Sequence, residues 1–343
     1  MNSTEDPSFY DAFKDDDFPI GFIVICIVRL MLSIVGLIFN GALIFVTFRS
    51  RRLRSRCNAL LAFDAACSGI AFVCNFVTFA VVCSGKKFIE LRQCFWLQFL
   101  PTIAMSLLLN SMLAVGIERL VSVVAPFWVN TLNSTLYVGT LILLCFANAV
   151  YTMVRLYPIS LIETPDMPVT CTINDLYQGE VGMALFGNAM LFTGLTILCY
   201  AIIWATLRFK KAKQNTDQTQ IDYTKRIFKC LLVNVIFVST GYFLNVAVLI
   251  LLTRISLSQV QIVFATYILG IITGISAIGT VPTLYIFSSD YREAFNEKLF
   301  RSAKQAQLLA TVVGLKAGHA VATAQNGVQN VRRVPVQMAS TYN

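Results

Sequence analysis

The chain has 343 residues, of which 57% are hydrophobic and only 13% are charged, and its formal net charge is +9. A soluble domain carries roughly 25% charged residues. The composition therefore excludes an ordinary soluble domain and indicates a polytopic membrane protein. An excess of Lys and Arg is expected in the loops on one side of a membrane, so it gives no support for nucleic-acid binding. The first residues lack a basic segment followed by a short apolar core, and we expect no cleaved signal peptide.

Seven apolar stretches are long enough to cross a bilayer as helices, at about 1.5 Å per residue across roughly 30 Å of hydrocarbon. Arg29 stands at the outer edge of the first stretch, where its long side chain should snorkel to the interface. Pro282 has no amide hydrogen and should kink the last stretch. The predicted spans are residues 30–48, 57–83, 93–117, 132–154, 181–207, 227–253 and 259–289.

The loops differ strongly in basic charge, which predicts the orientation. If the amino terminus is outside, the inner loops and tail hold twenty Lys and Arg and the outer segments hold six. The positive-inside rule then places the amino terminus outside and the carboxyl terminus in the cytoplasm. Asn2, in the sequon Asn2-Ser3-Thr4, becomes an expected glycosylation site, whereas the Asn133 sequon lies inside and is a chance match.

A short helix is predicted after the last span. Asp290 is placed as its cap with Glu293 three residues later, and Tyr291, Phe295 and Leu299 form an apolar stripe suited to the inner membrane surface. We therefore expect an all-α, seven-helix membrane bundle followed by an amphipathic helix. The predicted organisation is an acidic extracellular segment (1–18), the bundle (19–289), the surface helix (290–304) and a disordered cytoplasmic tail (305–343).

The chain resembles a rhodopsin-like G-protein-coupled receptor over about residues 34–300. Residues 116–126 (GIERLVSVVAP), which follow the third charge-free run, most resemble the nematode chemosensory receptors of serpentine class SX. Several separate positions match the anchors of that family, and together they are far more specific than any one alone. These positions are Asn40, Leu53-Arg54-Ser55, Asn58, Arg119, Pro126, Tyr200, Pro282 and Tyr285.

The resemblance implies roles for these residues. Arg119 would pair with Glu118 at rest and turn toward a heterotrimeric G protein when helices move apart, while Tyr200 and Tyr285 fill the space it leaves. The basic third inner loop would meet the G protein. Cys94 and Cys171 lie outside in the predicted topology, and the family spacing from Cys94 to Arg119 is matched, which implies a disulfide between the two cysteines. Cys83, near the outer end of span two, is the alternative partner.

Departures from the family pattern concern the polar centre of the bundle. The position that carries an acid in span two of the family holds Ser68 here, with Asp64 one turn nearer the cytoplasm, which puts the usual sodium site in doubt. Asn40 or water should satisfy Asp64. With Val281 before Pro282 in place of the usual Asn, Arg119 would be restrained mainly by Glu118, and we expect ligand-free signalling.

The ligand class is narrowed by exclusion. Pro101 stands where amine receptors carry an Asp, and the last span offers no Lys for retinal. The ligand should lie beneath the second outer loop, which carries Arg155 and Glu163. Candidate pocket residues are the polar and aromatic groups of the outer half-spans: Gln98, Thr102, Asn188, Tyr242, Asn245 and Tyr267.

Other classes of protein find less support. The single histidine, His319, lies in the tail, and no nucleophile-base or metal-ligand pattern is visible, so we expect neither an enzyme nor a cofactor. A channel or transporter would use several intramembrane charges, whereas Asp64 is the one acid well inside a span. A neuropeptide receptor remains the closer alternative, because outer acids such as Asp15, Asp16 and Asp17 could attract a basic peptide. The predicted function is a plasma-membrane receptor that binds a chemical cue outside and a G protein inside.

Overall fold

The fold is a bundle of long apolar helices, seen in a computed structural model that describes residues 8–131, 133–213 and 258–300 with scattered positions between 232 and 251. Six helices among the described residues are long and apolar enough to cross a membrane. They match the predicted spans except the sixth, at 227–253, most of which lies outside the described residues. The six are α2 (Ile20–Arg49), α3 (Arg56–Cys83), α5 (Phe99–Val124), α7 (Ser134–Pro158), α9 (Gly179–Lys213) and α11 (Gln259–Ile278), which continues as α12 (Thr280–Phe287).

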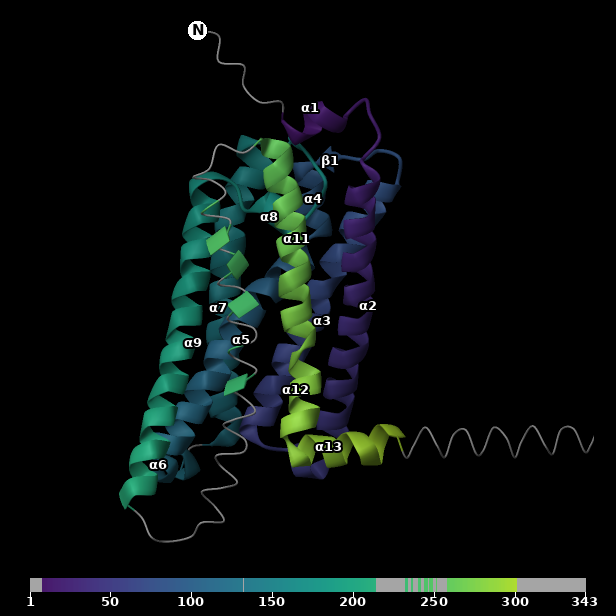
Figure 1. The fold of residues 1–343 in the computed structure, drawn as a ribbon. Coiled ribbons are helices and arrows are strands. Elements are labelled where there is room, and N and C mark those ends of the chain that lie inside the picture. Colours follow the sequence, from purple (N-terminus) through teal and green to yellow (C-terminus); the bar gives the residue numbers. More distant parts are fainter. Residues whose placement is uncertain are drawn as a thin grey trace, which may run out of the picture. The chain divides into compact units, whose positions relative to one another are not determined.

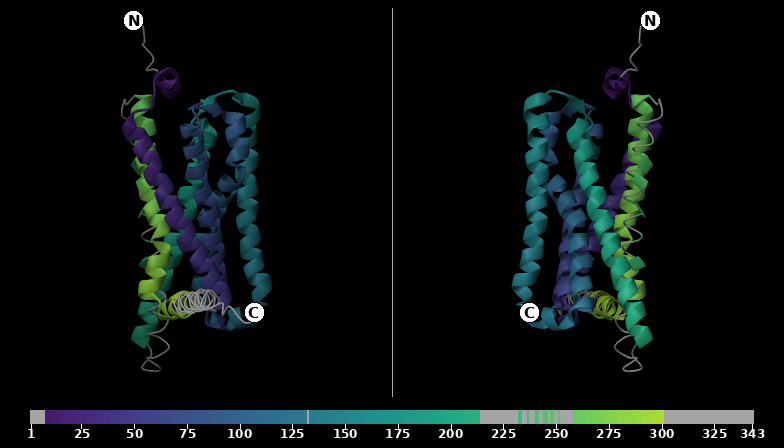
Figure 2. Two further views of the ribbon diagram at one scale, coloured as in Figure 1. Left: turned by 90° about the vertical axis from the view of Figure 1, so that its right-hand side faces the viewer. Right: turned by 90° about the vertical axis from the view of Figure 1, so that its left-hand side faces the viewer.

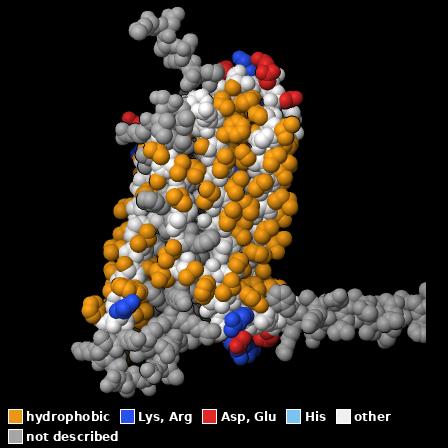
Figure 3. All heavy atoms as spheres, viewed as in Figure 1, with side chains coloured by type: hydrophobic (Ala, Val, Ile, Leu, Met, Phe, Trp, Pro, Cys, Tyr) orange, Lys and Arg blue, Asp and Glu red, His pale blue; other side chains and the backbone are white. Residues whose placement is uncertain are grey.

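The helices run side by side, and α5 lies at the centre of their contacts (Figures 1 and 2). It packs against α3, α7 and α9, while α2 packs against both α3 and α11. Accordingly, 61% of the central part of α5 is buried, a larger share than in any of the other five described spanning helices. Hydrophobic side chains cover the middle of the helices and charged ones gather mainly toward their ends, as expected for a protein embedded in lipid (Figure 3). Side chains on α5 can therefore contact several of the other described helices.

Small residues allow close helix contacts, as in other membrane bundles. A Cβ atom added to Gly36 in α2 would lie only 2.4 Å from Cε2 of Phe72 in α3. By contrast, a Cβ added to Gly41, later in the same helix, would meet no atom within 4 Å. The Phe72 ring thus occupies the space that the missing side chain of Gly36 leaves.

Several predicted boundaries are wrong in an informative way. The first spanning helix, α2, begins at Ile20, so Arg29 lies within it rather than at its edge. The third predicted span divides at Gln98 into α4 (Leu91–Leu97) and α5, and α5 continues to Val124, so Glu118 lies inside the helix. Helix α11 ends and α12 begins at Gly279, three residues before Pro282, and the predicted kink at Pro282 stays a prediction.

One end of the bundle, which we call the disulfide end, is tied together by the predicted bond between Cys94 and Cys171. Nearby, β1 (Ile89–Glu90) pairs antiparallel with β2 (Pro168–Val169), which joins the segment before α4 to the long loop between α7 and α9. The loop then forms α8 (Ile173–Leu176), capped by a reciprocal pair of bonds between Thr172 and Asp175. These ties fix the loop above the helix ends.

The described part of the amino-terminal segment packs onto the disulfide end. Helix α1 (Phe9–Phe13) lies there beside β1 (Figure 1). Phe9 contacts the rings of Phe18, Phe22 and Phe88 at centroid distances of 5.6 to 6.1 Å. Lys87 Nζ lies 2.9 Å from an Asp17 carboxylate oxygen. Aromatic contacts thus hold residues 9–18 in place, and the predicted outer acids Asp15, Asp16 and Asp17 lie in this segment.

The opposite end of the bundle, which we call the Arg119 end, carries short helical turns (Arg51–Leu53 and α6, Pro126–Thr131). Helix α13 (Ser289–Phe295) begins one residue before the predicted cap, and the Tyr291 amide donates to Ser288 Oγ at 3.5 Å, so Asp290 is not the cap. A π-helical turn (Asn296–Phe300) follows. Tyr291 and Phe295 are buried and Leu299 is half-buried, and the placement of this stripe on the inner membrane surface stays a prediction. Residues from Glu293 onward belong to a separate unit from residues 1–292, and only residues 293–300 of that unit are described.

Candidate functional site

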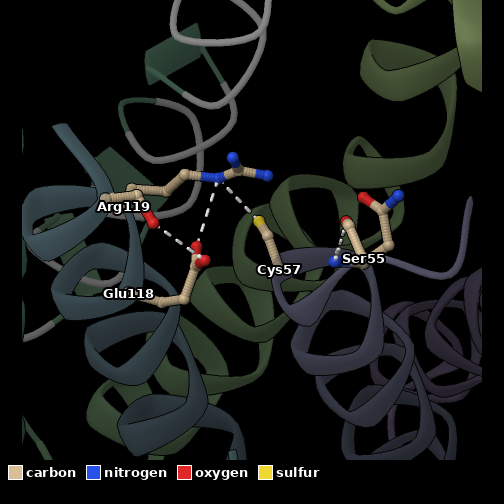
Figure 4. A network of polar contacts seen from close by, with 6 residues as sticks. Ser55, Cys57, Glu118 and Arg119 are labelled. Atoms are coloured by element: carbon tan, nitrogen blue, oxygen red, sulfur yellow. Dashed lines mark hydrogen bonds and ion pairs between the residues drawn. The ribbon is translucent and has the colours of Figure 1, made fainter. Parts of the chain in front are cut away.

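The Arg119 side chain lies between α5 and α3, held by two groups (Figure 4). Its Nε donates to Cys57 Sγ at 2.8 Å and lies 3.5 Å from Glu118 Oε2, which is an ion pair without a hydrogen bond. The other Glu118 oxygen accepts from Ser122 Oγ at 3.1 Å. Glu118 is 4% exposed, so the pair is largely removed from water. The predicted pairing of Arg119 with Glu118 is present, and Cys57 is an additional restraint that the sequence did not indicate.

Local sequence explains why Cys57 meets Arg119. Ser55 caps α3, and its Oγ accepts from the Asn58 amide at 3.3 Å, which fixes the start of the helix at Arg56 (Figure 4). Cys57 is therefore in the first turn of α3, where its thiol points at α5. A Ser at this point is also part of the Leu53-Arg54-Ser55 sequence that carries the family resemblance.

Tyr200 of α9 packs closely against α5. A Cβ added to Gly116 would lie 3.4 Å from the Tyr200 ring, so the glycine allows the ring to approach, and Tyr200 is 2% exposed. Its hydroxyl is near enough to Arg119 to interact with it electrostatically. Tyr285 and Pro282 lie half-buried in α12. Their proposed part in a switch stays a prediction.

The buried polar residues pair differently from the prediction. Asp64 Oδ1 accepts from Ser111 Oγ of α5 at 2.6 Å. Asn40 Nδ2 instead donates to the Gly36 carbonyl at 2.9 Å and to Ser68 Oγ at 3.2 Å. The expectation that Asn40 satisfies Asp64 is therefore wrong. Ser111 was missed, although a hydroxyl two turns before Glu118 in an apolar span was a signal that could have been used.

Two adjoining chambers open into the bundle near the disulfide end. The first holds about 750 Å³ of empty space, counting its open mouth, between α5, α7 and α9. The second holds about 740 Å³, counted in the same way, between α2, α3, α5 and α11. The described residues common to both linings are Met105, Ile173, Asn174 and Asn245. The loop that carries α8 thus roofs both chambers, whose concave linings combine apolar side chains with a few polar groups, as small-molecule sites do.

Some of the predicted pocket residues line the chambers, and others do not. Asn188 and Asn245 line the chambers, as expected. Tyr242 and the predicted glycosylation site at Asn2 lie outside the described residues. Arg155 and Glu163 are exposed and do not line the described chamber walls.

The other pocket candidates hold the roof rather than line the space. Gln98 is fully buried, and its Nε2 donates to the Cys171 carbonyl at 2.8 Å; Thr78 Oγ1 donates to the same oxygen at 2.8 Å. The Tyr267 hydroxyl donates to Thr170 Oγ1 at 2.9 Å. Thr102 is fully buried and also absent from the described linings.

Arg29 is the chamber residue that the sequence misplaced. Its side chain turns into the bundle and lines the second chamber, with the guanidinium carbon 4.9 Å from the centre of the Tyr267 ring. The described residues contain no group of His, Cys, Asp and Glu that could hold a metal ion. The described residues that line the chambers offer amides, hydroxyls and one guanidinium as polar groups toward a ligand.

Apolar helices lying side by side, a disulfide that ties the start of the third span to the following loop, and an acid-arginine pair near the far end of that span are the features that the sequence predicts for a heptahelical receptor. The family model of the serpentine type 7TM GPCR chemoreceptor Srsx matches residues 33–299, and the chain belongs to this family. The resemblance to nematode chemosensory receptors and the seven-helix fold are thereby confirmed. The family is one of receptors, not of enzymes. No curated protein matches the chain.

Proposed function

We propose that this protein is a plasma-membrane chemoreceptor that binds a small chemical cue at the disulfide end and activates a heterotrimeric G protein at the Arg119 end. The amino terminus would be outside and the carboxyl terminus in the cytoplasm, as the distribution of Lys and Arg predicts. The observation that supports this most directly is the course of α5. The same helix lines both chambers through Met105 and carries Arg119 some fourteen residues later.

A rigid helix with a ligand at one end and a restrained cation at the other can couple two sites. A cue that binds better when α5 moves relative to α3 would separate Arg119 from Cys57 and free its guanidinium for a partner. Arg is suited to this role because it stays charged and has five donors. Coupling of this kind is a difference in ligand affinity between two arrangements of the bundle.

The test is a screen of small metabolites in cells that carry a G-protein reporter, with surface expression measured for each receptor. In Arg119→Ala we expect the response to an active compound to fall by about tenfold or more, within the usual range of coupling between sites. Arg92→Ala is the matched control, since Arg92 is exposed and pairs only with nearby Glu90. Full signalling by a well-expressed Arg119→Ala receptor would overturn the assigned role.

The same screen separates the other classes of function. A current gated by the compound in cells that lack G proteins would indicate a channel. Activation confined to basic peptides would indicate a neuropeptide receptor. Either outcome would contradict the proposal.

A further inference from the structure

The position of Arg29 is unusual for a membrane helix. An arginine in a span ordinarily extends to the nearest interface, because an unpaired charge in a low-dielectric surrounding is costly. Here the guanidinium lies over the Tyr267 ring and against Gly270 of α11, where an added Cβ would be 3.1 Å from the guanidinium carbon. The absence of a side chain at Gly270 therefore makes room for the cation inside the second chamber.

The charge of Arg29 has no acid beside it among the described residues. None of the ion pairs found there joins Arg29 to a carboxylate, and its Nε is buried without a hydrogen-bond partner. The aromatic face of Tyr267 offsets part of the cost of burial. A cation that remains unpaired in a cavity is an attractive site for an anion from outside the protein.

The buried acids on neighbouring elements are already engaged. Asp175, on α8, is close enough to act on Arg29 electrostatically, but one of its oxygens accepts from the Thr172 amide at 2.9 Å and from Thr170 Oγ1 at 3.2 Å. Burial also raises the pKa of the Asp175 carboxyl above its ordinary value. Asp64, deeper in α3, accepts from Ser111. Neither acid occupies the place beside the Arg29 guanidinium.

The rest of the lining fits one anionic group on an apolar body. Arg29 is the one charged residue among the described residues that line the two chambers. Around it the wall of the second chamber includes apolar side chains such as Phe72, Leu108 and Ala277, together with uncharged hydroxyl and amide groups. Asn75 lies in the same wall, but its Nδ2 donates to Ser33 Oγ and its buried, unpartnered Oδ1 is an acceptor, so it adds nothing to the binding of an anion. A cationic ligand would meet no described acid in either wall and would be repelled by Arg29.

We propose that the cue is a small organic anion, an apolar molecule with a carboxylate or a similar acidic group, and that Arg29 binds that group. This inference rests on the proposed receptor function, because it names the class of ligand for the same cavity. A guanidinium suits a carboxylate especially well, since two of its N–H groups can donate in parallel to the two oxygens.

The binding test uses the purified full-length receptor and a panel of matched probes: straight-chain and aromatic carboxylic acids, with the primary amide and the primary amine of each. We expect carboxylates to raise the melting temperature while amides and amines do not. In Arg29→Gln the apparent affinity for carboxylates should fall about ten- to hundredfold, the loss expected when a charged hydrogen-bonding partner is removed. Arg92→Gln should bind as the unchanged receptor does.

Several outcomes would overturn the proposal. Carboxylates that stabilise Arg29→Gln as well as the unchanged receptor would show that they bind elsewhere. Equal stabilisation by amides or amines, no stabilisation by any carboxylate, or equal stabilisation by chloride or sulfate alone would each exclude an organic-anion site. If Arg29→Gln fails to fold, Gly270→Ala displaces the guanidinium instead and should weaken carboxylate binding by a similar factor.

A second measurement separates this inference from the receptor function. Carboxylates that bind through Arg29 in the melting assay but leave the G-protein reporter silent would support the anion site and refute the receptor function. Active compounds that are all neutral or cationic would support the receptor function and refute the anion site.

Discussion

Replacing Cys57 with alanine should raise signalling in the absence of ligand. Arg119 Nε donates to Cys57 Sγ at 2.8 Å, and on the proposed switch this contact exists only in the resting arrangement. Sulfur is a weak acceptor, so we take a net value of about 1 kcal/mol for the bond. Because 1.4 kcal/mol corresponds to a factor of ten, the ratio of active to resting receptor should rise by about fivefold.

The assay is the G-protein reporter without ligand, normalised to the number of receptors at the cell surface. Cys145→Ala is the matched control, since Cys145 is buried in α7 and makes no contact with Arg119. Cys57→Ser keeps an acceptor and should signal like the unchanged receptor. Equal basal signalling in Cys57→Ala and Cys145→Ala would refute the reasoning. Basal signalling of the unchanged receptor no higher than in mock-transfected cells would also contradict our expectation that Arg119 is only lightly restrained.

Two predictions concern stability and are measured by thermal unfolding of the purified receptor. Ser111→Ala leaves the buried Asp64 Oδ1 without its hydroxyl donor and should lower the free energy of unfolding by about 1–3 kcal/mol; an unchanged melting temperature would show that water replaces the donor freely. Gly36→Ala forces a Cβ against the Phe72 ring and should cost about 1–3 kcal/mol, whereas Gly41→Ala in the same helix should cost nothing; equal melting temperatures would contradict the assigned contact.

The arrangement of the spans could be predicted from the sequence because it depends on local properties. The length of an apolar run and the charges that flank it decide where a helix crosses a bilayer. The pair Glu118-Arg119 and the bond between Cys94 and Cys171 followed from the family resemblance. Their neighbours could not be predicted in the same way, since Cys57 meets Arg119 only through the rotation of α3 relative to α5.

The inward turn of Arg29 illustrates what sequence reasoning lacks. Whether an arginine near the end of a span extends to the interface or turns inward depends on the space available to it. That space is created by Gly270 and the face of Tyr267, some 240 residues further along the chain. In the same way, Gln98 was predicted to line a pocket because it is polar, but the course of the loop brings the Cys171 carbonyl to its amide.

The double hydrogen bond to the Cys171 carbonyl has a consequence for how the receptor meets its ligand. Thr78 of α3 and Gln98, at the junction of α4 and α5, both hold this oxygen, in addition to the disulfide at the same residue. The part of the loop above the chambers is therefore ordered before any ligand arrives, and its conformational entropy is not lost on binding. Selectivity among cues would then follow from the fit to a preformed roof, and a molecule that needs the loop to move would be disfavoured.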